Sequence, residues 1–206
     1  MAVKIKPMTK TQLVEYFRVY RDAFPDWRVE HDVVLVRSNG PIKQHIAFEA
    51  LRAGSYRPSC SIQVLVAPEV RLLTRFLDIK HRELLPRDHS AKWPDMVKAM
   101  EEQFLPSVRK PLNTAEVLQL GEEEVARDKI DNINYSSGLA ALNAYVGNMD
   151  RALWWCERIN AQLAAKGREP ADWEQLLATF AQQLREAITA DRVQSFFRDR
   201  AEPRSN

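Results

Sequence analysis

The chain has 206 residues, the length of one large or two small domains, and its 45% hydrophobic residues are enough to build a core. Its 30 basic and 28 acidic residues give a formal charge of +2, so no global field marks a nucleic-acid or membrane-surface protein. Membrane spans are also excluded, because no stretch approaches the roughly 18 uninterrupted apolar residues that one needs. Neither nucleic acid nor a membrane is therefore expected as a partner.

The first residues show no apolar core of a secretory signal, which predicts a cytoplasmic location. The two cysteines, Cys60 and Cys156, lie far apart and have no metal-ligand spacing. They are therefore expected to be reduced and buried, as is usual in the cytoplasm.

Charge is distributed unevenly along the chain. Residues 1–112 hold 19 basic and 13 acidic side chains, whereas residues 113–206 hold 11 basic and 15 acidic ones. The period of the hydrophobic pattern changes near the same place. We therefore expect a sheet-containing half over 1–112 and a helical half over 113–206, either as two domains or as one continuous domain.

A helix is predicted over 10–23, where Thr9 and Gln12 fit a capping box and Pro25 follows the last turn. The pattern then alternates with period two. Strands are predicted over 28–37, 43–51 and 60–66, forming an antiparallel meander that needs helices on its apolar face.

The remaining chain is predicted to be helical. Pro68 suits the first position of a helix that reaches Ile79, and Gly121 is expected to close a helix that begins after Asn113. Further helices are predicted over 93–104, 139–146, 151–166, 173–188 and 193–198. The predicted fold class is α+β, with a small antiparallel β-meander packed with helices, followed by an all-helical half.

The run 141–153 resembles the helix-turn-helix centre of a tetratricopeptide unit. Gly147 permits a left-handed stop, Asp150 can cap the next helix, and Ala144 and Ala152 allow close helix approach. No second copy occurs at a period near 34 residues, so the run predicts one helical hairpin and no solenoid.

Motifs for catalysis and cofactor binding are missing from the sequence, which has no Gly-rich phosphate loop, His-Glu-x-x-His, Gly-x-Ser-x-Gly or Cys-x-x-Cys. His81 and His89, with Asp88, come nearest to a metal set, but Pro86 lies between the histidines. We interpret them as solvated polar residues, because a zinc site needs further spaced ligands. No cofactor, metal or catalytic residue is assigned.

A cysteine-histidine pair is the one nucleophilic arrangement that the predicted strands allow. His31 and His45 could meet across the hairpin, and Cys60 lies on the third strand. The alternative is ordinary packing between neighbouring strands.

Two groups of residues are candidates for binding a partner. Near the predicted strand ends, a basic-aromatic group is formed by Arg37, Lys43, Arg52 and Arg57 with Tyr56. This group could grip phosphate or an acidic protein face, or simply form the polar face and turns of the sheet. In the helix from 151, Trp154 shares a stripe with Arg158 and lies about 100° from the apolar stripe through Trp155. Trp154 either packs against the sheet half or anchors a partner.

The acidic run 122–124 is interpreted as the solvated first turn of a helix, where the helix dipole favours carboxylates.

The ordered pattern through Gly40, Gln44, Tyr56 and Pro58, followed by a Val-rich strand, resembles uncharacterised bacterial α+β domains. Such domains recur among the immunity proteins of polymorphic-toxin and contact-inhibition systems. The resemblance spans about residues 9–165 and implies a stoichiometric, non-enzymatic binder that neutralises a toxin domain. It assigns no role to residues 168–206.

Three functions therefore remain open. The first is an immunity-type protein that binds one cognate toxin, in accord with the missing catalytic motifs and the segregated charge. The second is an adaptor or assembly chaperone that binds a partner helix through its helical half. The third is a hydrolase or nuclease built around His31, His45 and Cys60.

Overall fold

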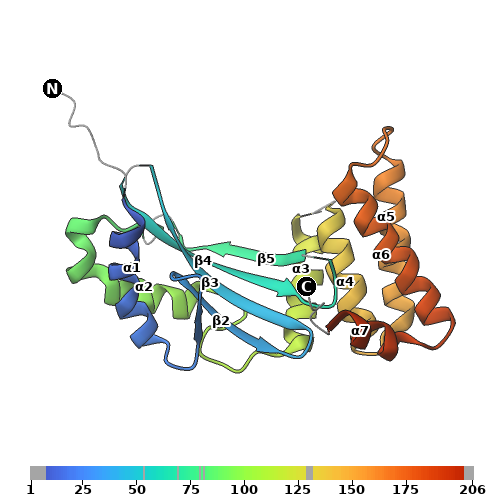
Figure 1. Cartoon of the computed structure of the whole chain (residues 1–206), viewed down its shortest axis with the longest axis horizontal. Helices are drawn as coiled ribbons and strands as arrows, with labels where there is room; N and C mark the ends of the chain where they lie inside the picture. The colour runs from blue at the N-terminus through green and yellow to red at the C-terminus, as the bar shows by residue number, and fades with distance from the viewer. Residues whose placement is uncertain are drawn as a thin grey trace. The chain divides into compact units, whose positions relative to one another are not determined.

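The computed structural model describes residues 8–52, 54–68, 70–78, 80, 82–128 and 132–201 (Figure 1). Its elements, in chain order, are α1 (Lys10–Ala23), β1 (Arg28–Glu30), β2 (Val34–Asn39), β3 (Ile42–Ala50), β4 (Tyr56–Val64), β5 (Val70–Phe76), the 3-10 turn η1 (Pro86–Asp88), α2 (His89–Gln103), α3 (Thr114–Asp128), α4 (Ile133–Tyr145), α5 (Met149–Ala164), α6 (Asp172–Thr189) and α7 (Val193–Ala201). The α+β class is confirmed.

The five strands form one antiparallel sheet in the order β1-β2-β3-β4-β5. The strand predicted over 28–37 is in fact a hairpin, in which Val29 pairs with Leu35 around a turn at His31 and Asp32. Along β3 burial alternates as expected, with Ile46 and Phe48 buried. The meander is therefore larger than the predicted three strands.

The helix predicted from Pro68 was wrong, because residues 70–76 form strand β5. Val70, Leu72 and Leu73 are buried while Arg71 is exposed. The apolar positions 70, 72, 73 and 76 of this run fit either the helical or the strand period, and pairing with β4 at the sheet edge decides for a strand.

Contacts divide the chain into two compact units: unit 1 is 1–38, 44–61 and 74–112, and unit 2 is 39–43, 62–73 and 113–206. Strands β2, β3, β4 and β5 thus each contribute residues to both units. No helix in the described part of the chain is long and apolar enough to span a membrane.

Unit 1 has a core of aromatic side chains from α1, α2 and the strands. The expected capping box starts α1, since Thr9 Oγ1 accepts a hydrogen bond from the Gln12 backbone at 3.2 Å and Gln12 Oε1 accepts one from the Thr9 backbone at 3.0 Å. Phe17 and Tyr20 of α1 pack on Phe48 of β3, with ring centroids 5.4 and 4.5 Å apart.

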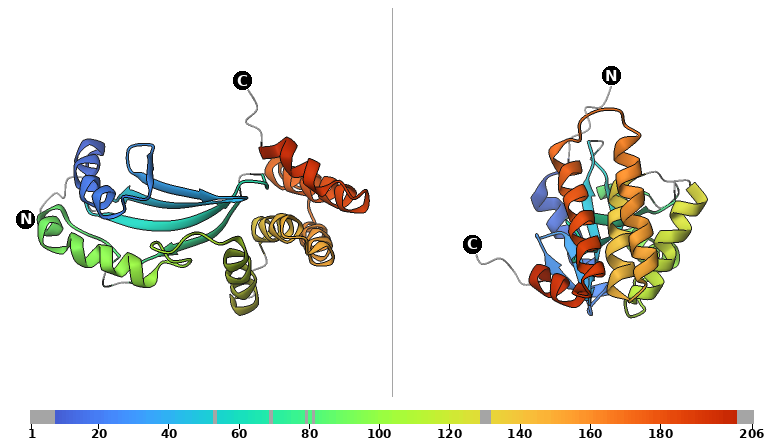
Figure 2. Two further views of the ribbon diagram at one scale, coloured as in Figure 1. Left: turned by 90° about the horizontal axis from the view of Figure 1, so that it is seen from below. Right: turned by 90° about the vertical axis from the view of Figure 1, so that its right-hand side faces the viewer.

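The helices of unit 2 pack through small residues. Helix α4 packs against α3, α5, α6 and α7, and α5 and α6 run side by side (Figure 2). Gly121 was expected to end a helix but lies inside α3, and a Cβ there would be 2.9 Å from Leu139 Cδ2. At Gly138 of α4, a Cβ would be 3.1 Å from Val70 Cγ1 and 3.2 Å from Leu72 Cδ1. Both glycines are therefore close-packing positions.

The predicted tetratricopeptide-like hairpin is α4 and α5. Gly147 has the left-handed φ of 90°, and Ala144 and Ala152 are fully buried. Asp150 is not the cap, because Asn148 occupies that position and Asp150 lies in the first turn of α5. This corrects the helix start by two residues.

A buried carboxylate fixes the loop between α5 and α6. Glu174 accepts hydrogen bonds from Lys166 Nζ at 2.5 Å, from Arg168 at 2.8 and 2.9 Å, and from the Ala171 backbone at 2.8 Å. These bonds, those from Arg168 foremost, lower the pKa of Glu174 to about 2.

Candidate functional site

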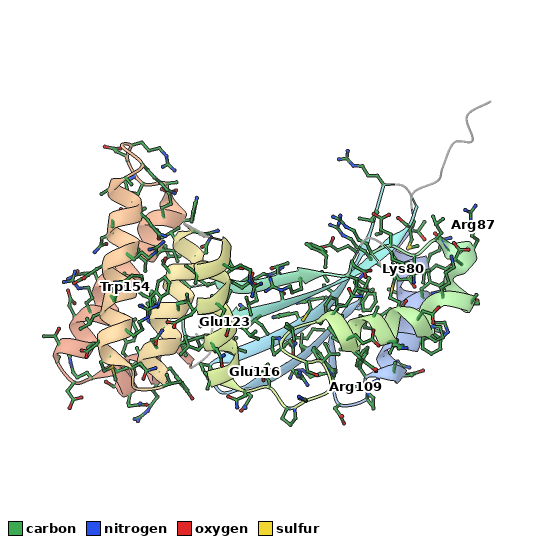
Figure 3. The ribbon with its side chains drawn as sticks, turned by 180° about the vertical axis from the view of Figure 1, so that it is seen from behind. Lys80, Arg87, Arg109, Glu116, Glu123 and Trp154 are labelled. Carbon is green, nitrogen blue, oxygen red and sulfur yellow. The ribbon has the colours of Figure 1, made fainter. Side chains whose placement is uncertain are left out.

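Trp154 is presented to solvent because α5 buries the neighbouring stripe. Ala152, Trp155, Cys156 and Ile159 are all buried, as the periodicity predicted. Since successive residues of a helix point about 100° apart, Trp154 turns away from that core. Its side chain remains 42% exposed, and Figure 3 labels it on α5.

Two guanidinium groups flank Trp154. Arg151 lies 4.4 Å and Arg158 5.6 Å from its ring centroid, at the −3 and +4 helical positions. The ring of Trp155 packs edge-to-face against that of Trp154, with the two ring centroids 4.7 Å apart. We call Arg151, Trp154 and Arg158 the Trp154 surface, which combines a large aromatic face with two cations.

A carboxylate on α3 fixes this arrangement. Glu122 Oε1 accepts hydrogen bonds from Arg151 Nε at 3.0 Å, Trp155 Nε1 at 3.1 Å and Asn143 Nδ2 at 3.3 Å. Burial raises the pKa of Glu122, but the bonds from Trp155, Arg151 and Asn143 outweigh it, so the pKa is lowered overall. An ionised Glu122 therefore holds α3, α4 and α5 in register.

Beside the Trp154 surface lies an open cavity of about 430 Å³. It is lined from α3 by Leu118, Gln119 and Glu123, and from the α4–α5 turn by Val146 and Asn148. The prediction that the run 122–124 forms the first turn of a helix was wrong, because α3 already begins at Thr114. Figure 3 labels Glu116 and Glu123 on this helix.

The predicted basic-aromatic group does not form one surface, because Tyr56 is fully buried. Its hydroxyl is 2.6 Å from the Tyr20 hydroxyl and 2.8 Å from His89 Nδ1, within the core of unit 1. Burial raises the pKa of both tyrosines above the ordinary value. Tyr56 is therefore a core residue and is not available to a partner.

Two of the three arginines from that group are occupied within unit 1. Arg37 donates to Gln44 Oε1 at 2.7 Å and to the Ser107 carbonyl, and it lies 4.7 Å over the Trp27 ring. Arg57 pairs with Glu49 at 3.0 Å and lies 4.5 Å over the ring of Phe76.

Arg52 is exposed between β3 and β4. Of the predicted strand-end group, it alone keeps an exposed side chain, since Arg37, Lys43 and Arg57 are partly buried and Tyr56 is fully buried.

The residues of the proposed cysteine-histidine pair lie in different settings. His31 is exposed in the β1–β2 turn. Gln44 Nε2 lies 3.4 Å from Cys60 Sγ, and the strand alternation puts His45 on the opposite face of β3 from Gln44. Burial raises the pKa of Cys60 to about 12, which opposes formation of a nucleophilic thiolate.

The interpretation of His89 as solvated was wrong, because its side chain is only 7% exposed. It bonds to Tyr56 and lies 4.4 Å from the Tyr16 ring, and burial lowers its pKa. His81 lies outside the described residues. The described residues also hold no group of three or more metal-ligating side chains.

The sequence predicted that Trp154 and Arg158 share one helix face, but it did not point to Arg151 or Glu122 beside them. The position of Arg151 could have been predicted from the sequence, since arginines at −3 and +4 from a tryptophan share its helix face. The position of Glu122 could not, because its contacts join three helices. No family model, curated protein or solved structure matches this chain.

Proposed function

We propose that this chain is a non-enzymatic, cytoplasmic immunity-type protein that binds and neutralises a cognate toxin domain through the Trp154 surface. The observation that carries the proposal is an exposed tryptophan with two guanidinium groups close to its ring, all three on one helix. The resemblance through Gly40, Gln44 and Pro58 supports a toxin as the partner.

The chemistry of the surface favours an acidic partner face. Tryptophan and arginine are the residue types most enriched among binding hot spots, and here the two cations lie beside the ring. Because Glu122 fixes Arg151 in advance, little side-chain entropy is lost on binding. Arg52 is proposed as a second contact, whereas Arg37 and Arg57 serve their own unit.

The test uses the product of a toxin-like reading frame next to this gene, or the partner that co-purifies from the native host. Titration calorimetry should show that Trp154→Ala weakens binding by about 30-fold or more, the range of a hot-spot truncation. Arg158→Gln should weaken binding by about tenfold. This loss of affinity should grow as the salt concentration falls, because opposite charges attract more strongly when they are less screened.

Trp173→Ala is the matched control. Trp173 is also in unit 2, on α6, and at 49% its exposure is similar to that of Trp154. Its replacement should leave the affinity within about twofold. Equal losses for the two variants, or full affinity for Trp154→Ala, would contradict the proposed surface. A gene that stands alone among metabolic enzymes would count against a toxin partner.

An adaptor or assembly chaperone is the second candidate, favoured by the cavity of about 430 Å³ beside α3. Such a protein would bind an amphipathic helix in this cavity. Val146 lines this cavity and is 41% exposed, so Val146→Lys should then abolish binding, whereas a partner that covers only the Trp154 surface should tolerate it.

The third candidate, a hydrolase or nuclease, predicts that replacing His31 and His45 together abolishes an activity. The raised pKa of Cys60 gives this candidate no support.

A further inference from the structure

A second cavity in unit 2 lies where two hairpin turns meet. Gly40 and Pro41 form the turn between β2 and β3, and Leu65 and Val66 follow β4. The Leu65 backbone donates to the Pro41 carbonyl at 2.7 Å, so the turns are joined directly. The cavity has a volume of about 450 Å³, within the range of small-molecule sites. We call it the hairpin-turn pocket.

The walls of this pocket are apolar and aromatic. Tyr145, at the end of α4, lies against Gly40, where a Cβ would be 3.3 Å from the Tyr145 hydroxyl. Phe197 of α7 packs on Tyr145 with ring centroids 5.9 Å apart. Leu65 and Tyr145 remain 40% and 38% exposed, so apolar surface is open to an occupant.

The charge at the rim has one sign. Arg198 and Arg200 of α7 line the pocket, together with Gln194, and its described lining contains no aspartate or glutamate. Gln194, Phe197 and Arg198 stand at i, i+3 and i+4, so one face of α7 supplies an amide, a ring and a cation. Asp199, between the two arginines, lines a different cavity, against α6.

Arg200 is held in place by its own unit. It donates to Gln183 Oε1 at 2.6 Å and lies 4.6 Å over the Phe196 ring. Arg198 is exposed. One guanidinium is therefore held by side chains of unit 2, and the other is exposed at the rim of the pocket.

We propose that the hairpin-turn pocket binds a small organic carboxylate with an apolar body, such as a medium-chain fatty acid. The chain would lie against the exposed sides of Leu65 and Tyr145, and the carboxylate would pair with Arg198 and Arg200. Arginine forms bidentate hydrogen bonds with carboxylates, and the apolar walls of the pocket would contact the apolar chain of the ligand. The site is independent of the Trp154 surface and does not rest on the proposed function.

The experiment measures octanoate binding to the full chain by titration calorimetry and by amide chemical shifts. Octanoate should bind saturably and shift the amides of Gly40, Leu65 and Val66. Octanol and octylamine, which share the chain but lack the negative charge, should bind at least tenfold more weakly. Acetate, which has the charge but no chain, should do the same.

Variants separate the pocket from general attraction to arginine. Arg198→Gln should weaken octanoate binding by about tenfold, whereas Arg127→Gln, an exposed arginine of α3 outside the pocket, should not change it. Leu65→Asp, at a wall residue that is 40% exposed, should abolish binding, with circular dichroism reporting its fold. Equal binding of octanol and octanoate, no effect of Arg198→Gln, or shifts confined to other residues would overturn the proposal.

Discussion

Replacing Tyr56 by phenylalanine removes one hydroxyl group from the buried core of unit 1 and leaves the ring in place. That hydroxyl joins Tyr20 at 2.6 Å and His89 Nδ1 at 2.8 Å. Tyr20 keeps its contact with Met96 Sδ at 3.2 Å, but His89 loses the partner of its Nδ1 atom. The variant thus leaves a buried polar nitrogen without that bond.

A buried group left without its partner costs about 1–3 kcal/mol, more than the net value of one hydrogen bond. For a chain of this size, each 1 kcal/mol lowers Tm by about 2–4 °C. A loss of about 2 kcal/mol therefore predicts a fall of about 4–8 °C for Tyr56→Phe. Tyr20→Phe should cost less, about 1 kcal/mol, since Tyr56 then keeps His89.

Thermal and urea unfolding of the two single variants and the double variant would measure these values. The double variant should be more stable than the summed losses predict, because the two hydroxyls share one bond. Partner affinity should stay unchanged. A Tm within 1 °C of the parent, or lost binding with full stability, would refute the assignment of Tyr56 to the core.

Three further outcomes follow from buried groups. The pKa of Glu174 in the folded chain is about 2, below its ordinary 4.5, so the ionised carboxylate stabilises the fold fully above pH 4.5 and this contribution is lost as the pH falls toward 2. In acid titrations, the difference in unfolding free energy between the parent and Glu174→Gln should therefore disappear over that range. Since burial lowers the pKa of His89 below 6.5, the urea midpoint should begin to fall as pH drops through 6.5, before the carboxylates protonate, and His89→Gln should remove this phase. Gly138→Ala gains about 1 kcal/mol of helix propensity but forces a methyl group against three buried side chains, at a cost of about 1–3 kcal/mol. The Tm should therefore fall by a few degrees, and a higher Tm would show that the packing relaxes.

Part of the candidate site could be predicted from helix periodicity. The exposure of Trp154 beside a buried Trp155 follows from the 100° step of one helix and needs no other element. The anchoring of Arg151 by Glu122 does not, because the two residues are 29 positions apart and meet only when α3 packs beside α5. The hairpin-turn pocket could not be predicted from the sequence either, since its walls come from two turns and two helices.

The α+β class, the capping box at Thr9 and the helical second half were determined by local signals: hydrophobic period, caps and turn residues act within a few positions. Tertiary structure alone decided that residues 70–76 form a strand, that Gly121 lies inside a helix, and that Tyr56 and His89 are buried partners. Each of these outcomes depends on which surface a segment packs against. That contact joins residues distant in sequence, and its free energy exceeds the small differences in local propensity.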